Sequence, residues 1–166
     1  MIKTASWLAL AVLIVAGDQL AKYLVSRTLA PGQSMTLAPF FNLVLVQNPG
    51  AAFSFLSEQP GWQRGFFIAI ALAASAWIVW LLARHSQQRL FALALTLVLA
   101  GAVGNVIDRI LIGAVVDFLD FHAFGHHWPA FNVADSAITC GAVLLAWDAF
   151  RPGRKGEGRA MKEGGV

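Results

Sequence analysis

Long apolar stretches dominate the pattern of hydrophobic and polar positions along this chain. Four of them approach the roughly 20 residues that a helix needs to cross the hydrocarbon core of a bilayer. They cover about residues 5–24, 66–83, 90–112 and 131–150. The pattern predicts an all-α integral membrane protein with four transmembrane helices in a single domain over residues 1–150.

Composition supports a lipid environment. Of the 166 residues, 58% are hydrophobic and only 13% are charged, whereas about a quarter of the residues of a soluble domain are charged.

The first stretch follows Lys3 and could be a cleaved signal peptide. However, its apolar pattern continues beyond Asp18 to Val25. We therefore interpret it as a retained helix.

Two polar segments, about residues 29–65 and 113–130, connect the spans on one side of the predicted bundle. Within the first, Phe41–Val46 is rich in β-forming residues and precedes Asn48-Pro49-Gly50, which predicts a strand and then a tight turn. The last residues, 151–166, contain Pro152, five glycines and several charges. Such a segment cannot bury a core, so we expect a disordered basic tail.

The distribution of positive charge predicts the orientation. Of the 12 Lys and Arg residues, four lie on or toward the side of the two connecting segments. The other eight lie on the opposite side and are Lys3, Arg84, Arg89, Arg151, Arg154, Lys155, Arg159 and Lys162. Cytoplasmic loops carry the excess of Lys and Arg, so both termini are predicted to be cytoplasmic. We read the basic pI of about 9.5 as topology and expect no nucleic-acid partner.

Ionisable residues inside spans cost at least ~2.5 kcal/mol each at the bilayer centre, so they usually mark function. At a rise of 1.5 Å per residue, Asp18, Asp108 and Asp135 all fall in the outer third of the membrane, and Asp117 follows at a similar level. Simpler interpretations stay open. Asp18 could simply form an ion pair with Lys22, one helical turn away, and have no further role. Asp148 lies at the opposite end of the last span, and we assign it no function.

The third span carries a face of small and polar residues, which are Gly101, Gly104, Asn105, Asp108 and Arg109. They share this face through i+3 and i+4 steps. Glycines let a neighbouring helix approach closely, so the polar residues would face protein and not lipid. This face could serve packing alone.

Carboxylates are the catalytic groups that remain after other motifs are excluded. The chain has no Gly-x-Ser-x-Gly, phosphate-loop or HExxH motif. His122, His126 and His127 are therefore expected to be exposed loop residues without a metal, and Cys140 a buried apolar residue. Two carboxylates held close share one proton and can hydrolyse a peptide bond by general acid–base catalysis. The spacing does not say which two aspartates meet.

Two alternatives use the same polar residues. A proton-coupled membrane transporter would employ the carboxylates as a relay. A non-catalytic scaffold would use the polar face for helix packing. In the sequence, the carboxylates gather near one side of the membrane, and no comparable series crosses to the other side, which favours the enzyme.

Five segments together resemble the signature blocks of lipoprotein signal peptidase, also called signal peptidase II. They occur in the family's order across residues 18–138, and the one small departure is Ala100, where the family commonly has glycine. The segments are Asp18-Gln19-x-x-Lys22, Asn48-x-Gly50-Ala51-Ala52-Phe53-Ser54, Gly101-x-x-Gly104-Asn105-x-x-Asp108-Arg109, Val116-Asp117-Phe118 and Phe131-Asn132-x-Ala134-Asp135-Ser136.

The resemblance implies roles for individual residues. Asp117 and Asp135 match the catalytic aspartates of the family. The positions that match its substrate-binding or orienting residues are Asn48, Asn105, Arg109 and Asn132. A supporting, structural role is implied for Asp18, Lys22, Gly50, Gly104 and Asp108.

The resemblance also implies the biology. The family removes the signal peptide from diacylglyceryl-modified prolipoproteins, on the amino side of the lipidated cysteine, in the bacterial inner membrane. Its active site faces the periplasm, and its fold has a small β-sheet cradle on the outer face. It uses no metal or cofactor, and the cyclic peptide globomycin inhibits it. Besides substrate and membrane lipid, nothing implies a partner, so we expect a monomer.

Overall fold

The computed structural model describes residues 3–50 and 62–151 of the chain. Four helices span these residues: α1 (Thr4–Thr28), α2 (Trp62–His85), α3 (Arg89–Leu111) and α4 (Val133–Phe150). Each is long and apolar enough to cross a membrane, which confirms the predicted four-helix membrane fold. The predicted tail, apart from Arg151, lies outside the described residues, as does the Ala51–Ser54 part of the second signature block.

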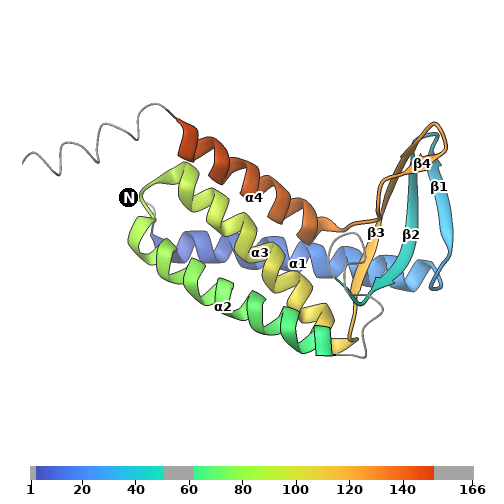
Figure 1. Ribbon diagram of the computed structural model, residues 1–166, viewed down its shortest axis with the longest axis horizontal. Coiled ribbons are helices and arrows are strands. Elements are labelled where there is room, and N and C mark those ends of the chain that lie inside the picture. The colour runs from blue at the N-terminus through green and yellow to red at the C-terminus, as the bar shows by residue number, and fades with distance from the viewer. Residues whose placement is uncertain (1–2, 51–61, 152–166) are drawn as a thin grey trace, which may run out of the picture.

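Helix α3 is the centre of the bundle and contacts each of the other three helices (Figure 1). Its small residues permit this position. A Cβ atom at Gly101 would collide with the Ala134 carbonyl oxygen of α4, and one at Gly104 would lie 2.9 Å from Asp18 Oδ2 of α1. The predicted face of small residues is therefore a true packing surface.

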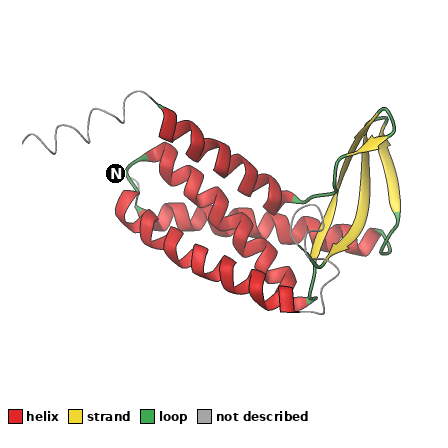
Figure 2. Ribbon diagram, in the orientation of Figure 1, coloured by secondary structure: helices red, strands yellow, loops and turns green. Residues whose placement is uncertain are grey.

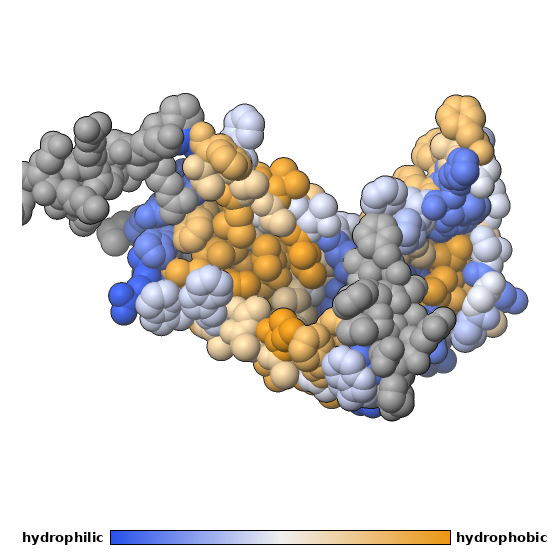
Figure 3. Space-filling model, in the orientation of Figure 1, coloured by the Kyte–Doolittle hydropathy of each residue, from blue (hydrophilic) through white to orange (hydrophobic). Residues whose placement is uncertain are grey.

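The outward faces of the helices are apolar. Large hydrophobic side chains such as Val12, Leu13, Leu72 and Val143 are exposed. Figure 3 shows that the surface over the helices is largely hydrophobic on the face in view. A soluble protein rarely exposes such a continuous apolar surface, so this surface fits contact with lipid.

A small antiparallel sheet stands at one end of the bundle (Figure 2). It comprises β1 (Ser34–Ala38), β2 (Phe41–Asn48), β3 (Val115–Ala123) and β4 (His126–His127), in the order β1-β2-β3-β4. The strand predicted at Phe41–Val46 is β2, and the small sheet expected from the resemblance is confirmed. The sequence analysis did not identify β1 or the nine-residue strand β3.

The last turns of α1 fasten the sheet to the bundle. Val25 packs in one buried cluster with Leu45 of β2 and with Val116 and Phe118 of β3. This contact accounts for the length of α1, which ends at Thr28, beyond the expected end near residue 24.

The opposite end of the bundle holds the N-terminus, the α2–α3 turn and the end of α4 (Figure 1). The indole nitrogen of Trp7 donates a 2.9 Å hydrogen bond to the carbonyl oxygen of Ser86 and so ties α1 to that turn. Within the described residues, the sheet therefore lies at one end of the bundle, and the N-terminal end of α1 and the α2–α3 turn lie at the other.

Candidate active site

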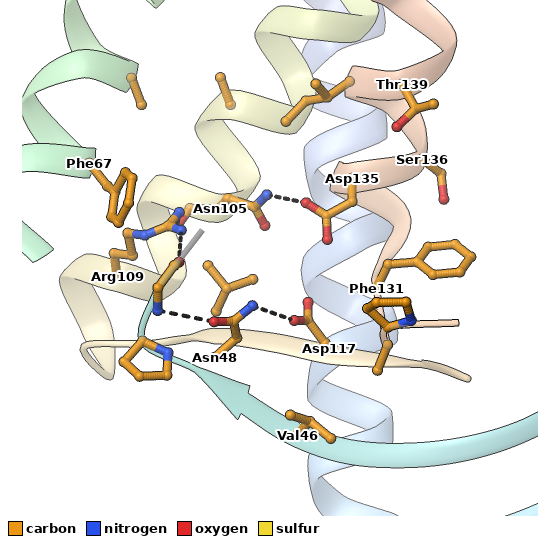
Figure 4. Close-up of a pocket in the computed structure, with 18 of the residues that line it drawn as sticks. Val46, Asn48, Phe67, Asn105, Arg109, Asp117, Phe131, Asp135, Ser136 and Thr139 are labelled. Atoms are coloured by element: carbon orange, nitrogen blue, oxygen red, sulfur yellow. Dashed lines mark hydrogen bonds between the residues drawn. The ribbon is translucent and has the colours of Figure 1, made fainter. Parts of the chain in front are cut away.

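A cavity of about 870 Å³ opens between the sheet and helices α2, α3 and α4. The space-filling view shows the hollow between the helical surface and the sheet (Figure 3). Asp117 of β3 and Asp135 of α4 both line this cavity, and their carboxyl groups point toward one another (Figure 4). The two carboxylates named from the sequence are thus brought together by separate elements.

Asp135 owes its place to the start of α4. Asn132 is the N-cap residue of this helix, and its Oδ1 accepts a 2.8 Å hydrogen bond from the Asp135 backbone N–H. The Asp135 side chain in turn accepts one from the Asn132 backbone N–H at 3.3 Å. This reciprocal pair is a capping box, which satisfies two helix N–H groups that would otherwise lack partners. It also directs the Asp135 carboxylate to the helix end.

Asp117 lies on β3 with only 3% of its surface exposed. Its Oδ1 accepts a 2.7 Å hydrogen bond from Asn132 Nδ2, and its Oδ2 accepts one of 3.2 Å from Asn48 Nδ2 of β2. Two amide donors from different elements therefore fix the direction of this carboxylate.

Amide side chains also link the two acids. Asn105 Nδ2 donates to Asp135 Oδ1 at 2.8 Å, while its own Oδ1 accepts from Asn132 Nδ2 at 3.3 Å. A chain of hydrogen bonds therefore runs from Asp135 through Asn105 and Asn132 to Asp117. Because these amides contact the acids directly, their geometry fits orientation of the pair.

Burial and, to a lesser extent, the nearby negative charge of Asp135 raise the pKa of Asp117 to about 7. Hydrogen bonds from Asn48 and Asn132 and the positive charge of Lys22 oppose this shift. A carboxyl group with a pKa near 7 still holds its proton through much of the neutral range, which general acid catalysis requires.

Arg109 holds the wall of the cavity. Its Nη2 donates a 2.8 Å hydrogen bond to the carbonyl oxygen of Gly50, and its guanidinium carbon lies 5.1 Å from the ring centre of Phe67. The Gly50 N–H in turn donates to Asn48 Oδ1 at 3.0 Å. Arg109 and Gly50 thereby secure the chain that follows Asn48, the last residue of β2 (Figure 4).

The residues expected to support the site form a buried charge cluster beneath it. Lys22 makes ion pairs of 2.7 Å with both Asp18 and Asp108. Gln19 joins them, donating to Asp108 Oδ1 at 2.9 Å. Gln19 was part of the first signature block but was not among the predicted site residues. The available signal was a polar side chain inside a predicted span, directly after Asp18.

The histidines and the cysteine differ from expectation. His122 lies near the end of β3 and stacks on His127 of β4 with ring centres 4.8 Å apart, so both belong to strands and not to a loop. His127 Nδ1 lies 2.9 Å from Asp120 Oδ1. Among the described residues, no three His, Cys, Asp or Glu side chains form a group suited to a metal ion. Cys140 was expected to be buried but is exposed and lines the cavity.

The comparisons with known proteins agree with this geometry. The family model described as Signal peptidase (SPase) II matches residues 10–151. The chain belongs to the signal peptidase II family. Members of this family are aspartic peptidases, so the chain is an enzyme, and the resemblance stated from its sequence is confirmed.

Relatives of this signal peptidase II chain are identical to it at more than half of the aligned residues. It is 57% identical to the lipoprotein signal peptidase of Cupriavidus necator over 149 residues, covering 90% of this chain and 85% of the relative. The lipoprotein signal peptidase of Paraburkholderia phymatum is 56% identical, covering 89% of each chain.

Two solved structures, each described as a bacterial membrane enzyme, share the fold. One has a TM-score of 0.79 and 35% identity, covering 87% of each chain. The other has a TM-score of 0.78 and 36% identity, covering 92% of this chain and 99% of that one. With four spanning helices and bacterial relatives, this signal peptidase II is a multi-pass inner-membrane protein.

Asn132 has two separable roles, which substitutions distinguish. Asn132→Ala removes the N-cap and is expected to cost about 1 kcal/mol of stability, together with a loss of cleavage rate because Asp117 loses its closest donor. Asn132→Ser keeps a capping oxygen but lacks the amide donors. Compared with Asn132→Ala, we expect Asn132→Ser to have a melting temperature in detergent close to that of the unmodified enzyme, but a cleavage rate that stays low. Recovery of both would show that the amide donors are unimportant.

Proposed function

We propose that the enzyme removes signal peptides from diacylglyceryl-modified prolipoproteins, cutting on the amino side of the lipidated cysteine, with Asp117 and Asp135 as its catalytic pair. The single observation that carries this proposal is the arrangement of the two acids. Their carboxyl groups face each other at a cavity that separate elements enclose (Figure 4). Membership of the signal peptidase II family supports the substrate class.

In the proposed reaction the pair holds one proton and binds a water molecule. The ionised carboxylate takes a proton from the water, whose oxygen attacks the scissile carbonyl carbon, while the other carboxyl group protonates the carbonyl oxygen. The product is a gem-diol. Its collapse breaks the C–N bond: one acid protonates the leaving nitrogen and the other takes a hydroxyl proton. A carboxylic acid and an amine leave, and the pair again holds one proton.

The cavity suits a substrate that is partly lipid. Its lining includes apolar side chains, among them Ile70 of α2, Ala102 of α3 and Ile138 of α4, as well as the aspartates and amides. Acyl chains and the apolar signal peptide can therefore contact the apolar side chains while the scissile peptide bond lies against the polar ones. The cyclic peptide globomycin is expected to compete for the same cavity.

The proposed orientation places both termini in the cytoplasm and the catalytic pair toward the periplasm. Eight of the 12 Lys and Arg residues support it. The arrangement of the bundle is compatible, because the N-terminus, the α2–α3 turn and the end of α4 lie together, away from the sheet (Figure 1). A lipidated cysteine at the outer leaflet would then meet the pair at the correct level.

The direct test uses purified monomeric protein in detergent and a diacylglyceryl-modified precursor peptide, with no ion gradient. We expect two fragments whose masses place the cut immediately before the modified cysteine. The unmodified peptide is the control and should be cleaved far more slowly. No cleavage of the modified peptide, together with proton movement in vesicles, would favour the transporter instead.

Activity is expected to fall as the pH rises through about 7. Below this pH Asp117 holds the proton that the pair shares, whereas above it that proton is lost and no acid remains to protonate the carbonyl oxygen. Asn48→Ala removes a hydrogen bond that favours ionised Asp117. The pKa of Asp117 should then rise and the fall in kcat should move to higher pH. A shift to lower pH would contradict this assignment.

A further inference from the structure

Lys22 of α1 does not line the cavity, but it contacts three polar side chains beside the catalytic pair. No residue of α1 lines the cavity, yet the Lys22 ammonium, with only 3% of the residue exposed, reaches three acceptors. These are Asp18 Oδ2 and Asp108 Oδ2, both at 2.7 Å, and Asn105 Oδ1 at 3.2 Å. An ammonium has three N–H donors, so all of them have a partner.

Each carboxylate paired with Lys22 holds the backbone beside one catalytic acid. Asp18 Oδ1 accepts a 2.8 Å hydrogen bond from the backbone N–H of Ala134, the residue directly before Asp135. Asp108 Oδ2 accepts one of 3.1 Å from the backbone N–H of Val116, the residue directly before Asp117.

A third connection is more direct. Asn105 Oδ1 accepts from Lys22, and Asn105 Nδ2 donates to Asp135 Oδ1 at 2.8 Å. Three paths therefore lead from one ammonium group of α1 to the two acids, one to the backbone beside Asp117 and two to Asp135 or its neighbour.

We propose that Lys22 is a positioning residue of the peptidase, which sets the separation of Asp117 and Asp135 by holding Asp18 and Asp108 together. This inference rests on the proposed function, since the separation matters only if the two aspartates act as a pair.

The physical reason is the burial of two like charges. Asp18 and Asp108 are 1% and 5% exposed, and both accept from the same cation. Without the cation the two carboxylates would repel one another, and a buried unpaired charge is costly. They would turn away and release the N–H groups of Ala134 and Val116. A displacement of the reacting groups by 1 Å can cost about 100-fold in rate.

Lys22 also acts on Asp117 through its charge. Its positive charge lowers the pKa of Asp117, against the larger opposing effects of burial and of Asp135. The other charged groups around this part of the site are Asp18 of α1 and Asp108 and Arg109 of α3. Removal of the Lys22 charge should therefore move the loss of activity at high pH to a higher pH. A lysine that served folding alone would leave this profile unchanged.

The test compares Lys22→Gln and Lys22→Arg with a control, Arg27→Gln, which removes one charge from an exposed position of the same helix. Cleavage of the lipid-modified precursor is measured in detergent, per folded molecule, across pH. For Lys22→Gln we expect kcat about 100-fold lower, KM within about twofold and a profile shifted to higher pH. Lys22→Arg keeps the charge and should lower kcat without the shift. The control should match the unmodified enzyme.

Unchanged kcat and pH profile in folded Lys22→Gln would overturn the inference. If that variant does not fold, Lys22→Arg carries the test. Its guanidinium keeps the charge but cannot place donors on Asp18, Asp108 and Asn105 as the ammonium does. A drop in kcat of about tenfold at constant KM is expected, and kcat equal to that of the unmodified enzyme would overturn the inference. Normal cleavage by Asp117→Asn would instead overturn the proposed function.

Discussion

Asp117→Asn and Asp135→Asn are each expected to abolish cleavage of a lipid-modified precursor, by about 1,000-fold or more. Asparagine has nearly the shape of aspartate but can neither hold the shared proton nor take one from water. Asn48 and Asn132 lie within hydrogen-bond distance of Asp117 and can still contact the new side chain. The variants should therefore fold, bind substrate and fail only in the chemical step.

Asp148→Asn is the matched control for this experiment. Asp148 lies at the far end of α4, near Phe150, and does not line the cavity. The variant should cleave at a nearly normal rate. Melting curves in detergent for all three variants would separate loss of chemistry from loss of fold. If Asp148→Asn were as inactive as Asp117→Asn, the position of the carboxylates in the membrane would not determine their function.

Gly101→Val is expected to destabilise the enzyme by about 2–3 kcal/mol, because overpacking a tight interface displaces the backbone. The new side chain would collide with the Ala134 carbonyl oxygen and would place its Cβ 2.5 Å from Ile138 Cγ1. The backbone of α4 must then move away from α3. Asp135 follows Ala134 directly, so the cleavage rate should fall together with the melting temperature.

Gly17→Val provides the control for this substitution. Gly17 is an exposed glycine of α1, and a Cβ at this position would meet no atom within 4 Å. It introduces the same side chain into a spanning helix without a collision. The melting temperature and the cleavage rate of the two variants are compared in one detergent. Equal effects would mean that the cost arises from valine in a helix and not from the contact between α3 and α4.

Much of the membrane architecture follows from local pattern alone. A run of about 20 apolar residues has few alternatives to a spanning helix, since every backbone polar group must be satisfied in lipid. The four predicted spans accordingly correspond to α1, α2, α3 and α4. Asn132 and Asp135 have the spacing of a capping box, a local signal for the start of α4 that the predicted span of about 131–150 did not use.

Strand β3 illustrates what pattern could not reveal. Four successive residues, Val115–Phe118, are buried, so both faces of the strand are covered and the alternation that identifies a surface strand is absent. Two aspartates within β3 also weaken its hydrophobic signal. The last turns of α1 cover the face that carries Val116 and Phe118, and Asn132 at the start of α4 contacts Asp117 on the other face.

The sequence by itself determined the membrane class, the number of spans and a short set of acidic candidates, because helix hydrophobicity and the cost of charge in lipid are local properties. Only the tertiary structure decided that Asp117 and Asp135 face each other and that Lys22 joins Asp18 to Asp108. These contacts connect residues from three helices and a strand. Their geometry depends on how closely α3 approaches its neighbours, which no spacing along the chain specifies.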